Sequence, residues 1–497
     1  MMSEALEKAR HYEETQSRKI SAAERPLFHL TPYVGWMNDP NGFSYYKGMY
    51  HMFYQYHPYN SQWGPMHWGH AVSNDLLHWE YLPAAIAPDM PYDNAGCFSG
   101  SAIELPDGRQ LLMYTGVHRE TMPDGTMRDI QTQCLAVGDG LNYTKYEGNP
   151  VLTEKDLPEG ASKFDFRDPK IWREPDGSYR AIVGNRPADG SGQFLLFKSE
   201  DAFHWSYMST VDENRNRFGK IWECPDLFTL DGKDVILTSP QDMLPVGYDY
   251  YNGNGTLCLM GHFYHESGIF TEESDQTIDH GIDFYAPQTV LTPDGRRVMI
   301  GWMQNWDSCG IREPEAPWAG QMSLPRELSI KNGRLCQKPS REFDALRNHP
   351  VSYQNILVEN DVHPVRLPGI DGRIADLELS IRPEDMDKVF RSFTIRFAEG
   401  GSFHTDIKFR TYEGTLRIDR MYSGSRRAII HQRKCGIDNA ASGFLKLRIV
   451  LDRYSCEIFI GDGEKTMTVA IYTDLAADGI SFLAHGKALM DITKYSI

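Results

Sequence analysis

The sequence of 497 residues predicts an all-β protein, in which a five-bladed β-propeller is followed by a C-terminal β-sandwich. Two observations lead to this prediction. Five times between residues 36 and 302, a polar or acidic cluster opens a segment, a short turn with a glycine follows, and the chain returns as an apolar run. After residue 356 this recurrence stops, and strands that alternate apolar with polar residues take its place.

The chain begins with a charged, helix-prone extension, residues 1–24, which lacks the apolar core of a secretory signal. No stretch of the sequence approaches the run of about 18 apolar residues that crosses a membrane as a helix. We therefore expect a protein that stays in the cytoplasm and has no membrane partner.

The predicted propeller spans residues 25–340. Its five units open at residues 36–42, 98–100, 166–169, 222–225 and 283–287. The glycines of the turns that follow are Gly48, Gly108, Gly177, Gly232 and Gly295, so consecutive units are 55 to 69 residues long. A repeat of this length, with several short strands in each unit, is typical of propeller blades.

The returning strands, such as residues 110–114 and 179–183, are nearly continuous apolar runs. Such runs suit strands that are covered on both faces, as they are when blades pack against blades. The innermost strands of a propeller line one central channel, so equivalent strand starts meet at one end of it. The sequence therefore predicts that Asp39, Asp168 and Glu223, one from each of three openings, share one pocket.

A polar stretch interrupted by prolines follows the propeller, and we expect a linker at residues 341–355. Residues 392–397 and 445–449 then alternate apolar with polar, as antiparallel strands with one solvated face do. A β-sandwich over residues 356–497, about 140 residues long, fits this pattern. We expect it to stabilise the propeller, and a homo-oligomer contact through it is left open.

Charge and cysteine content exclude some functions. The 51 basic and 68 acidic residues give a net charge of −17, which disfavours nucleic acid as a partner. The eight cysteines include no C-x-x-C pair or zinc-like spacing, so we expect reduced thiols and no metal site. Residues 73–79 and 199–205 both end in His-Trp, which we interpret as a capped turn with a packed aromatic side chain rather than as metal ligands.

The three carboxylates suit the hydrolysis of a glycosidic bond with retention, which needs one carboxylate as nucleophile and one carboxylic acid as proton donor. We expect Asp39 to be the nucleophile, because the amides and N–H groups of residues 38–42 can stabilise its charge. Glu223 faces two aspartates, which favours the protonated acid. Asp168, with Arg167 beside it, is expected to stay anionic and to stabilise the transition state. No cofactor is expected, since two carboxylates suffice for this chemistry.

Each motif taken alone has a structural alternative. Residues 38–42, Asn-Asp-Pro-Asn-Gly, are an ordinary turn sequence, and Arg167 with Asp168 could form a local ion pair. Their common position at the start of a repeat favours function. Aromatic residues such as Trp36, Trp63, Phe98, Tyr285 and Trp302 are more often packed between blades than stacked on a sugar. Those within or next to an opening cluster are the better candidates for stacking on a sugar face.

At these positions the sequence resembles glycoside hydrolase family 32, the β-fructofuranosidases. The motifs are Trp-Met-Asn-Asp-Pro-Asn-Gly at 36–42, Arg-Asp-Pro at 167–169 and Glu-Cys-Pro at 223–225. Flanking segments are also similar, at residues 53–58, 68–70, 98–101, 283–288, 324–328 and 452–459. The resemblance implies a five-bladed propeller with a β-sandwich, and retaining cleavage of a terminal β-fructofuranosyl unit.

Carried over by motif, the resemblance implies Asp39 as nucleophile, Glu223 as acid/base and Asp168 as stabiliser of the fructosyl oxocarbenium ion. It also implies a fructose pocket lined by Trp36, Asn38, Gln55, Trp63, Phe98, Ser99, Arg167, Tyr285 and Trp302.

The substrate is less defined. The resemblance extends to intracellular bacterial sucrose and sucrose-6-phosphate hydrolases, which implies sucrose, sucrose-6-phosphate or a short fructo-oligosaccharide. A phosphate group would need basic residues at the pocket rim. The residues in suitable loops, each of which is also typical of solvated surface, are Arg119, Arg128, Lys220 and Arg312.

Two other classes of function remain open. An arabinanase-like enzyme on a five-bladed propeller would invert, with carboxylates about 6.5–9.5 Å apart. A sugar-binding propeller without activity is the second alternative, although a binding protein gains little from three desolvated acids.

Overall fold

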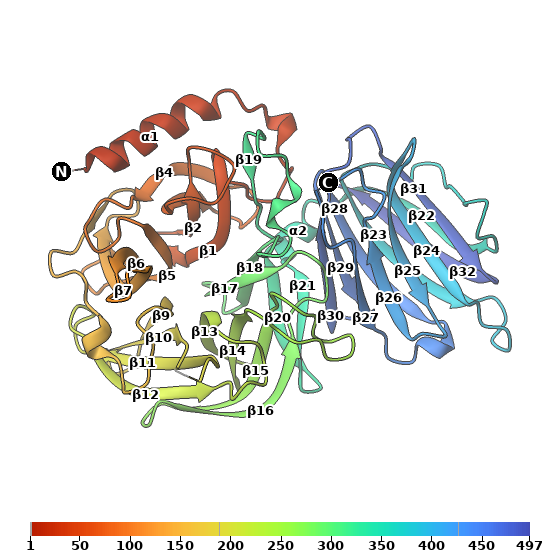
Figure 1. Cartoon of the computed structure of the whole chain (residues 1–497). Helices are drawn as coiled ribbons and strands as arrows, with labels where there is room; N and C mark the ends of the chain where they lie inside the picture. The colour runs from red at the N-terminus through yellow and green to blue at the C-terminus, as the bar shows by residue number, and fades with distance from the viewer. Residues whose placement is uncertain (1, 188, 426) are drawn as a thin grey trace.

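The computed structural model describes residues 2–187, 189–425 and 427–497. Its N-terminal part consists of five sheets arranged in a ring, and two further sheets form a sandwich beside the ring (Figure 1). Each of the five sheets corresponds to one predicted unit. The all-β architecture, the propeller and the sandwich are thus confirmed.

The propeller sheets contain four or five strands each. In spatial order the strands are β19 (Trp318–Ala319), β1 (Gly35–Tyr46), β2 (Met49–His57), β3 (His67–Ser73) and β4 (Glu80–Ile86); β5 (Gly96–Glu104), β6 (Gln110–Thr121), β7 (Met127–Gly138) and β8 (Tyr143–Lys145); β9 (Phe166–Arg173), β10 (Tyr179–Asn185), β11 (Gln193–Ser199) and β12 (Ser206–Glu213); β13 (Trp222–Leu230), β14 (Lys233–Pro240), β15 (Leu257–Tyr264) and β16 (Ile269–Thr277); β17 (Tyr285–Leu291), β18 (Arg297–Trp302), β20 (Arg326–Lys331) and β21 (Arg334–Pro339).

The first strands of the five units, β1, β5, β9, β13 and β17, surround the centre of the ring. Each contacts the next, and β17 contacts β1. The short strand β19 pairs in parallel with β1, with Trp318 opposite Gly35, so the end of the propeller chain is joined to its beginning. The second strands β6 and β14 are buried along nearly their whole apolar runs, as strands between packed sheets should be.

The sandwich packs a six-stranded sheet on a five-stranded one. The first contains β22 (Asn348–Val358), β32 (Ala488–Ser496), β23 (Ala375–Pro383), β28 (Leu445–Asp452), β29 (Ser455–Ile460) and β30 (Lys465–Ala470); the second contains β27 (Gln432–Gly436), β26 (Thr415–Asp419), β25 (Phe403–Arg410), β24 (Ser392–Gly400) and β31 (Gly479–His485). Strand β22 begins inside the range expected to be a linker, because Asn348 already pairs with Ser496 of β32. The division into 1–24, 25–340, 341–355 and 356–497 stays a prediction.

Helices are few and short among the described residues. The N-terminal helix α1 (Glu4–Ser17) begins at Ser3, whose hydroxyl accepts a hydrogen bond from Leu6 N, and lies over β4 (Figure 1). The remaining helices are α2 (Arg341–Asp344), η1 (Ala22–Glu24), η2 (Glu154–Asp156), η3 (Cys309–Ile311) and η4 (Ala440–Ser442). In the part of the chain that the structure describes, no helix has the length and apolar character needed to cross a membrane.

Charged side chains are buried between the propeller and the sandwich. His29 Nδ1 lies 2.9 Å from Asp452 Oδ2, and its Nε2 lies 2.9 Å from Glu457 Oε1. Arg326 binds Glu457 at 2.5 Å and Asp279 at 3.0 Å. All five side chains are fully buried, so the two domains share one ionic network (the interface network: His29, Asp279, Arg326, Asp452, Glu457).

Candidate active site

Each inner strand of the propeller has a β-bulge at its opening cluster. The pairing register shifts between Met37 and Pro40 in β1 and between Glu223 and Asp226 in β13. The corresponding shifts in β5, β9 and β17 fall at residues 98–100, 167–170 and 285–288. A bulge leaves residues unpaired and re-aims their side chains, and proline is tolerated there because no ladder N–H is needed. The five bulges therefore explain why these polar motifs leave their sheets and turn to one end of the channel.

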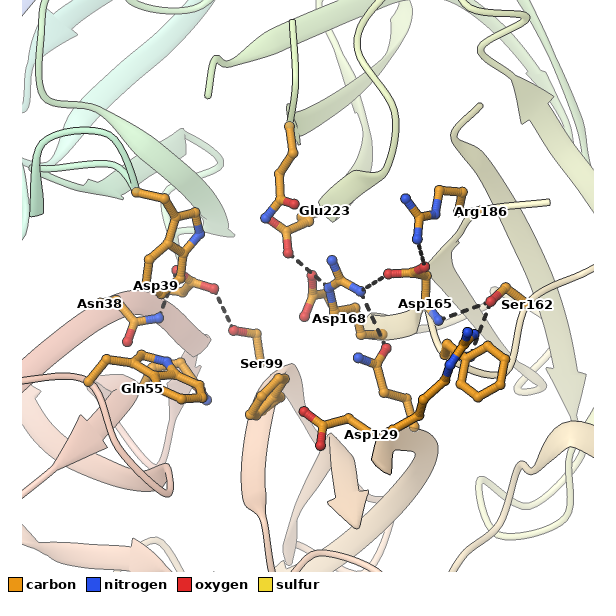
Figure 2. A pocket seen from close by; sticks show the side chains of 18 of the residues that line it. Asn38, Asp39, Gln55, Ser99, Asp129, Ser162, Asp165, Asp168, Arg186 and Glu223 are labelled. Atoms are coloured by element: carbon orange, nitrogen blue, oxygen red, sulfur yellow. Dashed lines mark hydrogen bonds and ion pairs between the residues drawn. The ribbon is translucent and has the colours of Figure 1, made fainter. Parts of the chain in front are cut away.

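The bulges of β1, β5, β9 and β13 contribute residues to a cavity of about 890 Å³, which is lined by all three predicted catalytic carboxylates. This volume suits a small sugar. Figure 2 shows Asn38 and Asp39 on one side of the cavity, Asp165 and Arg186 on the other, and Asp168 and Glu223 between them. The predicted convergence of Asp39, Asp168 and Glu223 is thus observed.

The Asp39 carboxylate is held by two side-chain donors. Ser99 Oγ donates to its Oδ2 at 2.7 Å, and Asn38 Nδ2 donates to its Oδ1 at 3.1 Å. The Asn38 amide is oriented in turn by Trp36, whose indole N–H donates to Asn38 Oδ1 at 2.8 Å. Burial and the charge of Glu223 raise the pKa of Asp39 above its usual value, and the hydrogen bonds from Ser99 and Asn38 offset part of this rise. The two hydrogen bonds from Ser99 and Asn38 hold the Asp39 carboxylate in one orientation.

Glu223 is bound by three donors from three different strands or loops. Arg167 Nε donates to its Oε1 at 2.8 Å, and Gln241 Nε2 and the Tyr285 hydroxyl reach its Oε2 at 2.8 and 2.7 Å. The Tyr285 hydroxyl also lies 2.9 Å from the carbonyl oxygen of Ser239. Because that carbonyl can only accept, Tyr285 can donate to ionised Glu223, or donate to Ser239 and accept from protonated Glu223. Glu223 can therefore keep a partner in both protonation states.

Asp168 lies near the other two carboxylates and has a left-handed backbone, with φ of 65°. Its Oδ2 accepts a hydrogen bond from Cys224 N at 3.0 Å, and the Cys224 thiol lies between Asp168 and Asp39, 3.6 and 3.5 Å from their Oδ2 atoms. Burial, together with the charges of Glu223 and Asp39, raises the pKa of Asp168 to about 7, although Arg167 lowers it. The group of three carboxylates thus holds a proton up to near-neutral pH. This differs from the expectation that Asp168 stays anionic, because burial and two neighbouring acids outweigh the effect of Arg167.

The position of Arg167 differs from the expectation. It was expected beside Asp168, but its guanidinium donates to Glu223 and to Asp165, at 2.8 and 3.0 Å. The bulge at residues 167–170 separates the side chains of the two neighbouring residues. Arg167 therefore lowers the pKa of Asp168 through space while it contacts the proposed acid.

The predicted fructose pocket divides into two layers. The residues that line the cavity are Asn38, Gln55, Trp63, Phe98, Ser99 and Arg167. Trp36, Tyr285 and Trp302 are instead buried beneath it, where Trp302 packs edge-on against Trp36 at 6.0 Å between ring centroids. Trp36 and Tyr285 act on the cavity through Asn38 and Glu223, respectively.

Sequence reasoning missed several residues that line the cavity: Met127, Asp129, Gln131, Ser162, Phe164, Asp165, Arg186, Gln241 and Trp306. Most come from β7 or from the loops around β9, β10, β14 and β18, where no recurring motif marks them. Asp165 alone had a signal, because it stands next to the predicted Phe166-Arg167-Asp168-Pro169 cluster.

Two of the four candidate rim residues line the cavity. These two are Arg119 and Arg128, which lie on the long hairpin of β6 and β7. Lys220 and Arg312 are not among the residues of its wall; Lys220 pairs with Asp242 at 3.4 Å, and Arg312 stacks on Trp318 at 3.5 Å. Sequence position could not separate these cases, because all four residues lie near loops on the same chain segments that build the propeller.

The chemistry of this site is that of a glycoside hydrolase. Carboxylates from three blades meet in a polar cavity, one held by Ser99 and Asn38 and another bound by donors that tolerate both of its protonation states. These are the features needed for a nucleophile and a general acid/base in glycoside hydrolysis.

Comparison with known proteins defines the family. The model of the glycosyl hydrolases family 32 N-terminal domain matches residues 29–339, and that of the glycosyl hydrolases family 32 C terminal matches residues 342–497. The chain therefore belongs to glycoside hydrolase family 32, and the resemblance found in its motifs is confirmed.

Relatives are similar over the whole chain. Raffinose invertase of Escherichia coli is 38% identical over 480 residues, which cover 94% of this chain and 93% of the relative. Sucrose-6-phosphate hydrolase of Escherichia coli is 36% identical over 481 residues, which cover 93% of this chain and 94% of the relative. The solved structure of a family 32 β-fructofuranosidase of Bombyx mori is 33% identical, with a TM-score of 0.83, and the match covers 99% of this chain and 98% of that one.

Proposed function

We propose that this protein is a β-fructofuranosidase that hydrolyses the terminal β-fructofuranosyl unit of sucrose-type sugars with retention of configuration. The observation that carries the proposal is the meeting of Asp39, Asp168 and Glu223 at the floor of one cavity. The relatives named invertase and sucrose-6-phosphate hydrolase support the same reaction. Two carboxylates in different hydrogen-bonding surroundings suit the two roles that retention needs.

Asp39 is the proposed nucleophile. Ser99 and Asn38 hold its carboxylate, so one oxygen can attack the anomeric carbon of fructose without a prior rotation of the side chain. The attack forms a covalent fructosyl ester as the bond to the leaving sugar breaks.

Glu223 is the proposed acid/base. It donates its proton to the leaving oxygen in the first step, and the resulting carboxylate takes a proton from the water that hydrolyses the ester in the second. Arg167, Gln241 and Tyr285 stabilise the carboxylate between the two steps. Tyr285 stays protonated throughout, because burial and the charge of Glu223 raise its pKa.

Asp168 is the proposed stabiliser of the oxocarbenium ion. Burial and the charges of Glu223 and Asp39 raise its pKa to about 7, so the group of three carboxylates can share a proton near neutral pH. A proton shared among these carboxylates is available to Glu223, which must be protonated to act as the acid. Once Glu223 is protonated, the Asp168 carboxylate is free to accept hydrogen bonds from sugar hydroxyls as positive charge develops on the ring.

The wall of the cavity contains three arginines besides Arg167. Arg119 pairs with Asp129 at 3.1 Å and Arg186 with Asp165 at 2.5 Å. Among the described residues Arg128 has no carboxylate partner, and its guanidinium lies over the Phe164 ring, 5.0 Å from the centroid. An unpaired arginine in a cavity suits a phosphate group, so sucrose-6-phosphate is the proposed preferred substrate. A phosphorylated sugar does not cross a bilayer unaided, which supports a cytoplasmic location.

The test is kcat/KM for sucrose and sucrose-6-phosphate, measured side by side for wild type and Arg128→Gln. We expect a preference for the phosphorylated sugar, and a loss of about 10-fold with that substrate alone in the variant, because a hydrogen bond between charged groups contributes about 1.5–3 kcal/mol. Lys220→Gln, which replaces an exposed cation outside the cavity wall, is the control. Equal use of both sugars would contradict the phosphate preference, and no cleavage of either would contradict the proposed function.

A further inference from the structure

The segment between β16 and β17, residues 278–284, connects the active site to the sandwich. Strand β30 is the outermost strand of its sheet, and this propeller segment pairs with its free edge. His280 N and Ile282 N donate to the carbonyl oxygens of Thr466 and Thr468, at 2.8 and 2.9 Å. In return, Thr468 N donates to Asp279 Oδ1 at 2.9 Å. The propeller segment thus occupies a sheet edge of the other domain.

A buried ion pair continues this contact toward the active site. Arg420, which follows β26 of the sandwich, binds Asp283 Oδ2 through Nη1 at 2.6 Å, and both side chains are fully buried. The same nitrogen donates to Ala470 O at 2.8 Å, and Ala470 N donates to Asp283 Oδ2 at 2.8 Å. Arg420 Nε donates to Ile430 O at 3.1 Å. The Oδ2 atom of Asp283 is therefore bound by two groups of the sandwich, the Arg420 guanidinium and the Ala470 N–H.

Asp283 stands two residues before Tyr285, the first residue of β17 and a direct partner of Glu223. The backbone of Ile282, next to Asp283, is bound on both sides. Its N–H donates to Thr468 O, and its carbonyl oxygen accepts from Asn305 Nδ2 at 2.8 Å. Asn305 precedes Trp306, which lines the cavity. Tyr285, which contacts Glu223, and Trp306, which lines the cavity, are thus both connected to a segment that the sandwich holds in place.

We propose that Arg420 is a positioning residue for Glu223, acting from the sandwich through Asp283 and Tyr285. The inference rests on the proposed role of Glu223 as acid/base. Without the guanidinium, Asp283 is a buried carboxylate that has lost its cation and must move or take up a proton. A shift of the chain at Asp283 moves the Tyr285 hydroxyl, and displacements of about 1 Å at a catalytic group cost up to about 10²-fold in rate.

The test exploits the dependence of acid catalysis on the leaving group. Sucrose needs a proton on its leaving oxygen, whereas 4-nitrophenyl β-D-fructofuranoside releases a stable phenolate and needs little acid assistance. For Arg420→Met we expect kcat/KM to fall about 10-fold or more with sucrose and less than about 3-fold with the nitrophenyl substrate. Glu223→Gln should show the same selectivity with a larger loss.

Two further variants keep the test decisive. Arg420→Lys retains a positive charge near Asp283 but loses the three hydrogen bonds of the guanidinium. It is therefore expected to fold even if Arg420→Met does not. It should show the same difference between the two substrates, with a smaller loss. Arg427→Gln removes an exposed residue of the same hairpin, which donates to Gly310 O at 3.0 Å, and should change neither substrate. Equal losses with both substrates in the Arg420 variants would overturn the inference. Wild-type enzyme without activity on either substrate would overturn the proposed function and this inference with it.

Discussion

Two clusters of buried carboxylates have opposite electrostatic surroundings. In the interface network, His29 and Arg326 each contact two acids, and the pKa of Glu457 is lowered to about 2 while that of His29 is raised to about 9. In the active site, Arg167 contacts Glu223 but neither Asp39 nor Asp168, and the pKa of Asp168 is raised to about 7.

The difference lies in how the carboxylates of each cluster are paired with cations, since both clusters are buried. Paired acids stay ionised over the physiological range and hold the two domains together. Acids that share too few cations keep a proton that can be exchanged, which is what acid/base catalysis needs. A raised pKa of a buried carboxylate therefore indicates a catalytic role in the active site, and a lowered pKa indicates a stabilising role in the interface network.

The largest expected effect is on turnover. Asp39→Asn and Glu223→Gln should each lower kcat for sucrose by about 10³-fold or more, because a nucleophile or a general acid/base is lost. The melting temperature should stay within a few degrees of wild type, since both replacements keep the shape of the side chain. Circular dichroism and calorimetry check the fold. Near wild-type turnover in either variant would show that the residue does not have the proposed role.

In the interface network the same kind of change should act on stability. Glu457→Gln leaves Arg326 and His29 with fewer anionic partners, and breaking a buried pair costs about 3–5 kcal/mol. We expect a clear drop in the urea midpoint, with kcat unchanged in the folded enzyme. A lower kcat at an unchanged midpoint would remove the distinction between the two clusters.

The stability of the interface should depend on pH in a defined window. The folded pKa of His29, about 9, exceeds the ordinary value of 6.5, so its contribution is complete below pH 6.5 and is lost as the pH rises toward 9. Glu457 behaves oppositely: its contribution is complete above pH 4.5 and is lost as the pH falls toward 2. The difference in melting temperature between wild type and His29→Gln should thus narrow between pH 6 and 9. A constant difference would contradict a charged His29.

The smallest expected effect is a gain in stability from an active-site change. The folded pKa of Asp168, about 7, lies above the ordinary value of 3.8, so its ionisation makes folding less favourable as the pH rises from 3.8 to 7. Asparagine removes this cost and tolerates the left-handed backbone. Asp168→Asn should therefore raise the melting temperature by a few degrees at pH 8, and less at pH 5, while activity falls. A lower melting temperature at pH 8 would indicate that Asp168 is stabilised by its surroundings.

The sequence could predict which carboxylates meet, because their motifs recur in phase and the inner strands of a propeller converge. It could not predict the partner of Arg167, since a bulge decides which way that side chain turns. Nor could it separate Trp63, which lines the cavity, from Trp302, which is buried below it. Gln241 and Trp306 lie on loops without a recurring motif, and the role of Arg420 depends on contact between two domains.

The most direct test of the central claim is the stereochemistry of fructosyl transfer. Sucrose is cleaved in the presence of methanol, and the methyl fructoside is identified by NMR, which avoids the mutarotation of free fructose. Two displacements, the first by Asp39, predict methyl β-D-fructofuranoside. The α-anomer would indicate a single displacement and would contradict the assignment of Asp39 as nucleophile.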